Sequence, residues 1–352
     1  MIMKIISIMG ARPNFVKMYP LSKALDKKGI DHVIVHTGQH YDVNMSDIFF
    51  QEMYYKKPKY NLDVGSASHG KQTGQMIERI EIVLLKEKPN VVIVPGDTNS
   101  TLAGALAATK QHIPVAHLEA GLRSFDKRMP EEINRILTDH CSDLLFCPTK
   151  TAIDNLKNEG IVKGVHKVGD TMFELAHLMR EQIEKTELKI KLPSDFILCT
   201  IHRAENTTNG RISKIFAELS EIEQTIVIPL HPRTKNKLIE LKLIEKAESE
   251  LTIIPPVGFL EFSKLLKESN AVITDSGGVQ KEAYWNRKPC ITVRDTTEWI
   301  ETINAGANIL SEPNRINELT KKMLKKKIEY NDALYGYIDT SKRIIKLLEK
   351  YS

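Results

Sequence analysis

Short apolar runs rich in β-branched residues alternate with amphipathic, helix-like segments along the whole 352-residue chain. Continuous apolar runs such as Asn90–Val94 (N-V-V-I-V) are typical of strands buried on both faces. Parallel strands need crossover connections, which are usually helices, so this alternation predicts an α/β fold with parallel sheets covered on both faces. The expected strands are Ile5–Met9, His32–His36, Val91–Pro95, Val115–Leu118, Leu144–Cys147, Val165–Val168, Ile197–Ile201, Ile226–Leu230, Leu251–Ile254, Ala271–Thr274 and Cys290–Val293.

The chain is long enough for two domains of ordinary size. The polar stretch Glu181–Asp195 interrupts the alternation and is interpreted as the entry to a second domain. The last expected helix, Ser341–Lys350, could pack on either domain. The helices expected between the first strands are Phe15–Lys28, Gln72–Lys86, Thr98–Lys110, Glu131–His140 and Thr149–Asn158.

Composition and charge favour a soluble, cytoplasmic protein. No apolar run approaches the ~20 residues of a membrane span, and Met1–Met9 is interpreted as a first strand, without a signal-peptide pattern. The net charge of +5 comes from dispersed lysines, which favours solvated surface over a nucleic-acid patch. No C-x-x-C pair is present, so zinc or redox chemistry is not expected and the thiols fit a reducing compartment. The cysteines are Cys141, Cys147, Cys199 and Cys290.

Charged groups of the first half follow predicted strands or open predicted helices. Arg12 and Lys17 belong to G-A-R-P-N-F-V-K after the first strand, where a helix N-terminus and a guanidinium would bind an anion. A surface cap at Arg12 and a solvated Lys17 are an equal alternative. Asp97 follows the strand Val91–Pro95, and the alternative of a helix N-cap is equally favoured. The set predicts one site at the carboxyl edge of the sheet.

Two further carboxylates are expected at this edge. Glu119, in H-L-E-A-G-L-R-S, ends an apolar strand and should be partly buried, which is rare for a carboxylate that is neither paired nor functional. Glu131 and Glu132 open a helix in M-P-E-E-I-N-R, and one of them could be only a complement to the helix dipole.

The second half carries a matching set of polar groups. His202 and His231 each follow a predicted strand and lie near an arginine, which indicates a cleft lining. Ser276, Gly277 and Gly278 would let backbone amides approach a diphosphate at a helix N-terminus, and Glu282 could accept the hydroxyls of a ribose. A glycine-rich turn with a cap is the alternative.

Together these motifs resemble the non-hydrolysing UDP-N-acetylglucosamine 2-epimerases, in the same order and with similar spacing from Gly10 to about Ala307. The resemblance implies two Rossmann-like domains (GT-B-like), 1–171 with 337–352 and 172–336, with the active site in the interdomain cleft. It also implies a UDP-sugar substrate, no cofactor or metal, a homodimer, and a supply of sugar nucleotide for cell-surface polysaccharide or glycan synthesis. The implied active-site residues are Arg12, Lys17, Asp97, Glu119, Glu131 and His202, and the implied UDP-binding residues are Phe262, Ser276, Gly277, Gly278 and Glu282.

The family's reaction is reversible inversion of carbon 2 of UDP-N-acetylglucosamine by elimination and re-addition of UDP. Two departures bear on this expectation. Trp299-Ile300-Glu301 stands where many members carry Arg-Pro-Glu, and Tyr41–Asn44 does not match the bacterial pattern for a second, activating UDP-GlcNAc site. A modified UDP-HexNAc such as a diacetamido uronate, a GT-B glycosyltransferase and a catalytically silent sensor are the alternatives. The sensor would keep the UDP motifs but lose the acids, and the chain has both.

Overall fold

The computed structural model describes residues 3–38 and 55–351, so Tyr41–Asn44 lies outside the described residues. The chain divides into two compact units, Met1–Met179 with Ala333–Ser352 and Arg180–Asp332. The expected boundaries after residues 171 and 336 lie about eight residues before and about four residues after these, and the first differs because helix α7 (Thr171–Leu178) packs against the first and last helices of the first unit. Glu174 of α7 accepts hydrogen bonds from the backbone N–H (2.8 Å) and the hydroxyl (2.7 Å) of Ser341.

The first unit contains a seven-stranded parallel sheet, in the order β3-β2-β1-β4-β5-β6-β7 among the described residues. Its strands are β1 (Lys4–Met9), β2 (Asp31–His36), β3 (Tyr60–Asn61), β4 (Val91–Pro95), β5 (Val115–Leu118), β6 (Leu144–Cys147) and β7 (Val165–Lys167). Its other helices are α1 (Arg12–Lys27), α3 (His69–Glu87), α4 (Asn99–Lys110), α5 (Pro130–Cys141), α6 (Lys150–Asn158), α16 (Thr340–Leu348) and the 3-10 turn Glu349–Tyr351.

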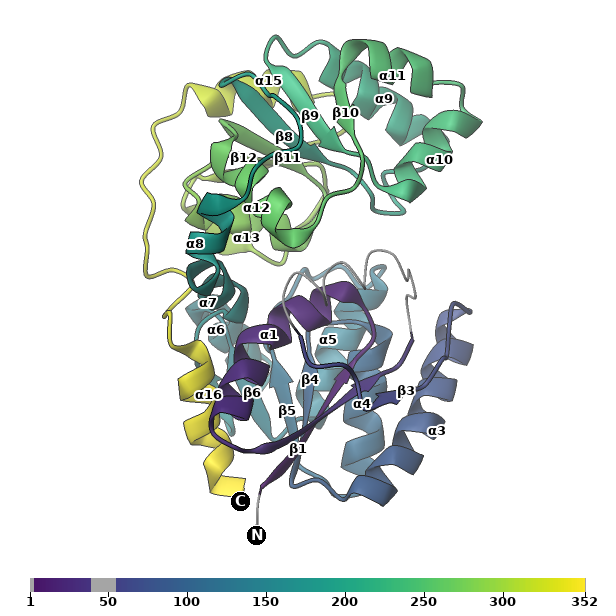
Figure 1. Ribbon diagram of the computed structural model, residues 1–352, viewed down its shortest axis with the longest axis vertical. Coiled ribbons are helices and arrows are strands. Elements are labelled where there is room, and N and C mark those ends of the chain that lie inside the picture. Colours follow the sequence, from purple (N-terminus) through teal and green to yellow (C-terminus); the bar gives the residue numbers. More distant parts are fainter. Residues whose placement is uncertain (1–2, 39–54, 352) are drawn as a thin grey trace. The chain divides into compact units, whose positions relative to one another are not determined.

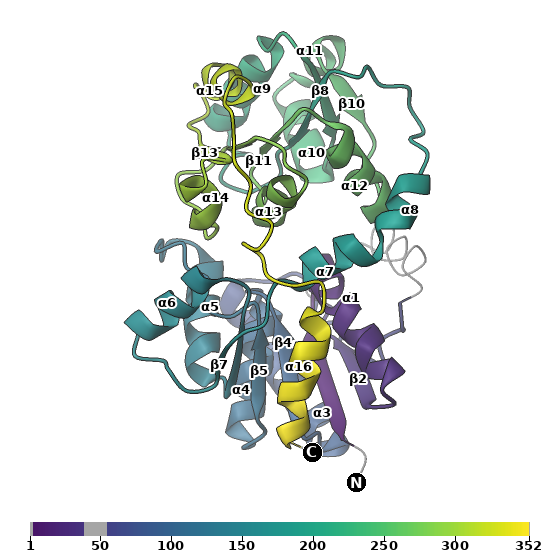
Figure 2. The ribbon, with the colours of Figure 1, turned by 90° about the vertical axis from the view of Figure 1, so that its left-hand side faces the viewer.

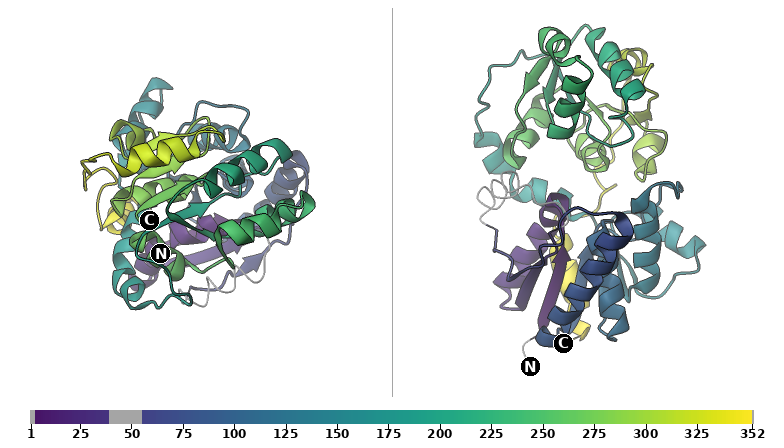
Figure 3. Two further views of the ribbon diagram at one scale, coloured as in Figure 1. Left: turned by 90° about the horizontal axis from the view of Figure 1, so that it is seen from above. Right: turned by 90° about the vertical axis from the view of Figure 1, so that its right-hand side faces the viewer.

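Helices cover both faces of this sheet. On one face, apolar side chains of α3 and α4 pack on alternate strand residues such as Ile6, Val33 and Val92. On the other face, α1, α7 and α16 pack against one another (Figures 1 and 2). Figure 3 shows α3 on the side of the sheet opposite to α16. The strands are therefore buried on both faces, which explains their continuous apolar sequences.

The second unit contains a six-stranded parallel sheet, in the order β10-β9-β8-β11-β12-β13. Its strands are β8 (Phe196–Thr200), β9 (Thr225–Pro229), β10 (Thr252–Ile254), β11 (Ala271–Thr274), β12 (Cys290–Thr292) and β13 (Asn308–Leu310). Its helices are α8 (Arg180–Lys185), α9 (Asn209–Ser220), α10 (Pro232–Glu240), α11 (Ile244–Glu250), α12 (Phe259–Glu268), α13 (Gly277–Trp285), α14 (Ile300–Asn304) and α15 (Ile316–Leu324).

Two apolar cores enclose this second sheet. Side chains of α9, α10, α11 and α15 pack on one face, against residues such as Ile197 and Ile273. Side chains of α12 and α13 pack on the other face, against Leu198 and Val272. Figure 1 shows the first helix group beside the sheet and α12 and α13 across from it. Each unit is thus a three-layer α/β domain.

The expected α/β class with parallel sheets is confirmed, and all eleven expected strands are present to within a residue or two at each end. The short strands β3 and β13 were not predicted, because two or three residues carry no readable pattern. Helix α1 begins at Arg12, three residues before the expected start, and contains Pro20. Among the described residues, no helix combines the length and apolarity of a transmembrane segment.

Candidate functional site

The candidate residues of the first unit lie where neighbouring strands end. In the sheet, β1 lies next to β4 and β4 next to β5. From β1 the chain adds β2 and β3 toward one edge, and from β4 it adds β5, β6 and β7 toward the other, so the topology switches between β1 and β4. Open α/β sheets bind ligands at such a switch point, beyond the carboxyl ends of the strands. The segments that leave these three strands carry Arg12 and Lys17, then Asp97, then Glu119.

Lys17 and Glu119 form an ion pair between α1 and the end of β5. The two side chains are 14% and 9% exposed, so the alternative of a solvated Lys17 is wrong and the expected burial of Glu119 is confirmed. Glu119 also has a φ of +76°, which a non-glycine residue adopts only under steric strain. Such strain costs about 1–3 kcal/mol and persists mainly at sites that need a fixed geometry.

Asp97 is held by a cation from α5. Its Oδ2 lies 2.6 Å from Nη1 of Arg135, whose side chain is 2% exposed. The N-cap of α4 is Thr98, whose hydroxyl accepts from the N–H of Thr101, so the N-cap alternative for Asp97 is wrong. The Asn134 side chain also donates to the backbone carbonyl of Asp97, at 2.9 Å. The Asp97 carboxylate is therefore fixed but remains partly exposed.

The two adjacent acids at the start of α5 differ in environment. Glu132 is buried and accepts from the N–H groups of Ser124 and Phe125 and from Arg135 at 2.8–3.0 Å. Burial alone would raise the pKa of Glu132, but the Ser124 N–H, the Arg135 charge and the other hydrogen bonds outweigh it and lower the pKa. Glu132 is thus a structural acid. Glu131 is half-buried and lies one helical turn before Arg135, on the same face of α5.

Gly96, which precedes Asp97, lies in contact with residues at the start of α1. It has a φ of +71°, and a Cβ at this position would lie 3.0 Å from the Nζ of Lys17. Asn14 donates to the Pro95 carbonyl (2.9 Å) and accepts from the N–H groups before α1. The turn before Asp97 therefore packs directly on the start of α1, which also carries the exposed Arg12 as its first residue.

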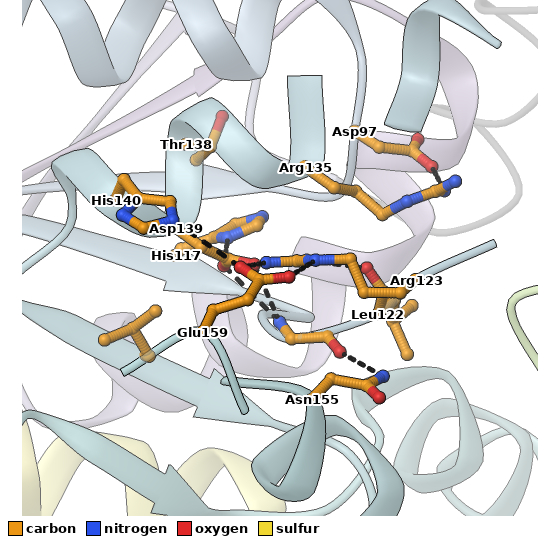
Figure 4. A network of polar contacts seen from close by, with 12 residues as sticks. Asp97, His117, Leu122, Arg123, Arg135, Thr138, Asp139, His140, Asn155 and Glu159 are labelled. Atoms are coloured by element: carbon orange, nitrogen blue, oxygen red, sulfur yellow. Dashed lines mark hydrogen bonds and ion pairs between the residues drawn. The ribbon is translucent and has the colours of Figure 1, made fainter. Parts of the chain in front are cut away.

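A polar network lies beneath this set (Figure 4). Arg123 donates to Asp139 (2.6 Å) and to both carboxylate oxygens of Glu159 (2.6 and 2.7 Å). His117 contacts Asp139 with one ring nitrogen (2.6 Å) and the Gly96 carbonyl with the other (2.7 Å). Sequence reasoning did not assign roles to these residues. The sequence signal that could have identified them is their place in the recognised motifs. His117 and Arg123 lie in H-L-E-A-G-L-R-S, and Arg135 lies in M-P-E-E-I-N-R.

The candidate residues of the second unit also follow adjacent strands. Asp275, directly after β11, accepts from the N–H groups of His202 (3.0 and 3.1 Å) and Arg203 (2.9 Å) after β8. The rings of His202 and His231 have centroids 5.4 Å apart, as expected for residues that line one edge. His231 caps α10 by accepting from the N–H of Arg233, so it has a structural role.

Helix α13 begins at the predicted glycine pair. Ser276 is its N-cap without a side-chain capping bond, and Gly277 is its first residue. A Cβ at Gly277 would collide with the Glu298 carboxylate, so any larger residue would have to displace that buried side chain. Glu282 is half-buried on the second turn of α13, and Phe262 of α12 packs against the core beneath. The helix N-terminus and Glu282 thus belong to one element, as an anion and ribose site would need.

The departure at Trp299 has a structural counterpart. The Trp299 side chain is buried, and the ammonium of Lys281, which is fully buried on α13, lies 4.5 Å from the centroid of its ring. Arg294 and Glu298 form a buried ion pair beside them, at 2.9 Å. Among the described residues, no group of three or more His, Cys, Asp or Glu side chains could hold a metal ion.

The fold is a two-domain α/β fold, with helix N-termini and carboxylates at the carboxyl ends of its strands. A model of the UDP-N-acetylglucosamine 2-epimerase family matches residues 23–349. The chain belongs to this family of sugar-nucleotide isomerases.

Similar proteins differ in the sugar that they are named for. A UDP-2,3-diacetamido-2,3-dideoxy-D-glucuronate 2-epimerase of Pseudomonas aeruginosa is 51% identical, over 99% of this chain and all of that protein. A UDP-N-acetylglucosamine 2-epimerase of Methanocaldococcus jannaschii is 46% identical, over 98% of this chain and 99% of the relative.

The solved structures agree with the GT-B-like fold. The M. jannaschii enzyme in complex with UDP-GlcNAc and UDP superposes with a TM-score of 0.92, at 45% identity over 99% of this chain and all of that one. The Neisseria meningitidis enzyme bound to UDP-GlcNAc has a TM-score of 0.87, at 32% identity over 99% of this chain and all of that chain. A Streptomyces nogalater glycosyltransferase, 14% identical with a TM-score of 0.59, shares the fold alone.

Proposed function

We propose that this protein interconverts UDP-N-acetylglucosamine and UDP-N-acetylmannosamine by elimination and re-addition of UDP, without net hydrolysis. The observation that carries the proposal is the placement of Asp97 and Glu119 at the ends of adjacent strands, each beside a cation. Such a reaction would supply sugar nucleotide for cell-surface polysaccharide or glycan synthesis.

Inversion at carbon 2 is difficult because no carbonyl group acidifies the proton on that carbon. One carboxylate removes the proton, and the electron pair forms a double bond between carbons 1 and 2 while the bond from carbon 1 to the UDP oxygen breaks. A carboxylic acid then protonates the opposite face of carbon 2, and UDP adds again at carbon 1. Asp97, Glu119 and Glu131 are the proposed acid and base groups, because a positioned carboxyl can serve in either role. Lys17 holds Glu119 in place, and the buried Arg135 does the same for Asp97.

The leaving UDP needs groups that stabilise a developing anion. We assign this task to Arg12 and His202, together with the N–H groups of Gly277 and Gly278 at the start of α13. Glu282 would accept the ribose hydroxyls, and Phe262 would contact the nucleotide. The proposal requires the residues of both units to act on one substrate.

A second candidate substrate is UDP-2,3-diacetamido-2,3-dideoxy-D-glucuronate. One observation favours it, the 51% identity to the P. aeruginosa enzyme. The buried Lys281–Trp299 pair, where many members carry an arginine, marks a departure from the pattern of the UDP-N-acetylglucosamine enzymes. Trp299 lies beside the start of α13, since its Nε1 would be 3.5 Å from a Cβ at Gly277. A tryptophan in place of an arginine therefore removes a positive charge from this helix N-terminus. The chemistry at carbon 2 is the same for both sugars.

Proton NMR in deuterated buffer tests both candidates in parallel. Each UDP-sugar is incubated with the protein, and we expect one to give its C2 epimer with deuterium at carbon 2. Full retention of the original proton would overturn the elimination route. Release of free N-acetylmannosamine and UDP would indicate a hydrolysing enzyme, and transfer of the sugar to an added acceptor would indicate a glycosyltransferase.

A further inference from the structure

His117 lies at the centre of β5, two residues before Glu119, and is fully buried. Its Nδ1 is 2.6 Å from Oδ1 of Asp139, and its Nε2 is 2.7 Å from the carbonyl oxygen of Gly96. A carbonyl oxygen only accepts hydrogen bonds, so the second contact requires a proton on Nε2. The protonation of the whole ring then depends on the state of Asp139.

Asp139 is held in its ionised form. Its Oδ2 accepts from Arg123 (2.6 Å) and from the N–H of Gly121 (3.1 Å). The Arg123 guanidinium is itself buried, so this ion pair keeps the negative charge on Asp139 whatever the state of the His117 ring. An ionised carboxylate only accepts, so Nδ1 of His117 must donate to it. A neutral imidazole has one N–H, and this ring needs two.

We propose that His117 is a buried imidazolium that positions the catalytic turn Gly96–Asp97, an inference that rests on the proposed epimerase function. It is a positioning residue, because its buried ring reaches Asp97 only through the Gly96 carbonyl. Figure 4 shows the ring beside Asp139 and Arg123, with Asp97 and Arg135 in the same view.

The charges around the ring balance. Two cations, His117 and Arg123, face two carboxylates, Asp139 and Glu159, of which only Glu159 has substantial exposure. His140 lies 3.5 Å from Glu159 at the outer end of the network. Buried ion pairs of this kind add little net stability because of the cost of desolvation, so a role in fixing geometry accounts for them better than a role in stability.

Three polar backbone groups of the turn Gly96–Asp97 are hydrogen-bonded to the surrounding structure. The Gly96 N–H donates to the Leu118 carbonyl (2.9 Å), the Gly96 carbonyl accepts from His117, and the Asp97 carbonyl accepts from Asn134. Gly96 is thus bonded on both sides by residues of β5, the strand that leads to Glu119. His117 therefore fixes the spacing between the two carboxylates. A misplacement of about 1 Å in such a site can lower turnover by about a hundredfold.

Two amide variants separate the two contacts of the ring. An asparagine amide superposes on Nδ1 and a glutamine amide on Nε2, so His117→Asn keeps the donor to Asp139 and His117→Gln keeps the donor to Gly96. We expect kcat to fall by about a hundredfold in His117→Asn with little change in KM or UDP affinity. In His117→Gln we expect at least about tenfold more activity than in His117→Asn. His140→Asn, at the exposed end of the network, is the matched control and should retain wild-type kcat.

Equal loss of activity in both variants, in proportion to a loss of thermal stability, would mean that His117 only supports the fold and would overturn the proposal. Neutron diffraction of the wild-type protein is independent of any variant and should show a deuteron on both ring nitrogens. A deuteron on one nitrogen alone would refute the imidazolium. An inactive wild-type enzyme with both deuterons would instead refute the proposed function, so the two failures are distinguishable.

Discussion

Glu131 and Glu132 are adjacent acids in the first turn of α5, and we expect their amide variants to fail in opposite ways. Glu131 is half-buried and lies one helical turn before Arg135, whereas Glu132 is 1% exposed and accepts five hydrogen bonds of 2.8–3.0 Å. Glu131→Gln should therefore lower kcat by roughly 10² or more, the usual contribution of an acid or base, and leave stability unchanged.

In Glu132→Gln, an NH₂ group replaces one of the two oxygens and faces N–H donors. The buried charge of Arg135 also loses a partner, and breaking a buried pair in this way costs about 3–5 kcal/mol. For a unit of about 200 residues, that loss corresponds to a fall of roughly 6–20 °C in Tm.

Thermal unfolding followed by circular dichroism, together with turnover measured by NMR, checks both variants side by side. Each variant serves as the control for the other, because the substitution and the helix are the same. A Glu131→Gln enzyme with wild-type turnover would show that Glu131 only complements the helix dipole. A Glu132→Gln protein with wild-type Tm would refute the assignment of Glu132 as a structural acid.

Three further predictions follow from the same contacts. Glu282→Ala should weaken UDP binding by about 1.5–3 kcal/mol in calorimetry, with exposed Glu268→Ala as control, and an unchanged affinity would place the ribose contact elsewhere. Lys17→Met should lower turnover and remove the charge that holds Glu119, whereas Lys17→Arg should restore part of the turnover; equal turnover in the two variants would argue against ion pairing. The pKa values of Glu132 and Asp139 lie below their ordinary values, so their stabilisation is complete above about pH 4–5 and is lost as the pH falls further. Urea unfolding at decreasing pH should show this loss, and a smaller loss in Glu132→Gln.

The parallel sheets were predictable because buried strands have to be apolar along their whole length. The position of Glu119 was predictable for a related reason, since a carboxylate that ends such a strand is partly buried by its own neighbours. For its partner Lys17, the sequence favours a ligand contact and a solvated position equally. The sequence separation of 102 residues gives no local pattern for that pair, and only the folded chain brings Lys17 of α1 to the residue that follows β5.

The supporting residues could not be assigned in the same way. His117 has the appearance of an ordinary strand residue, and its role depends on groups 21 and 22 residues away on either side, which no spacing rule connects. The domain boundary was displaced for a similar reason. The sequence divides the domains after residue 171, whereas contacts of Thr171–Leu178 with α1 and α16 place α7 in the first unit.

The two adjacent carboxylates Asp97 and Glu119 explain why so many buried charges lie around them. Carboxylates at the ends of neighbouring strands repel each other, and the repulsion grows as water is excluded. Lys17 and Arg135 offset it, each bound to one of the two, so both acids can occupy one sheet edge. Each cation needs support in turn, and Arg135 obtains it from the buried Glu132. Removal of one cation should therefore affect both acids. In a double mutant cycle of Lys17→Met and Arg135→Met, the effects of the two single variants on turnover should not add, because additivity holds only for independent sites.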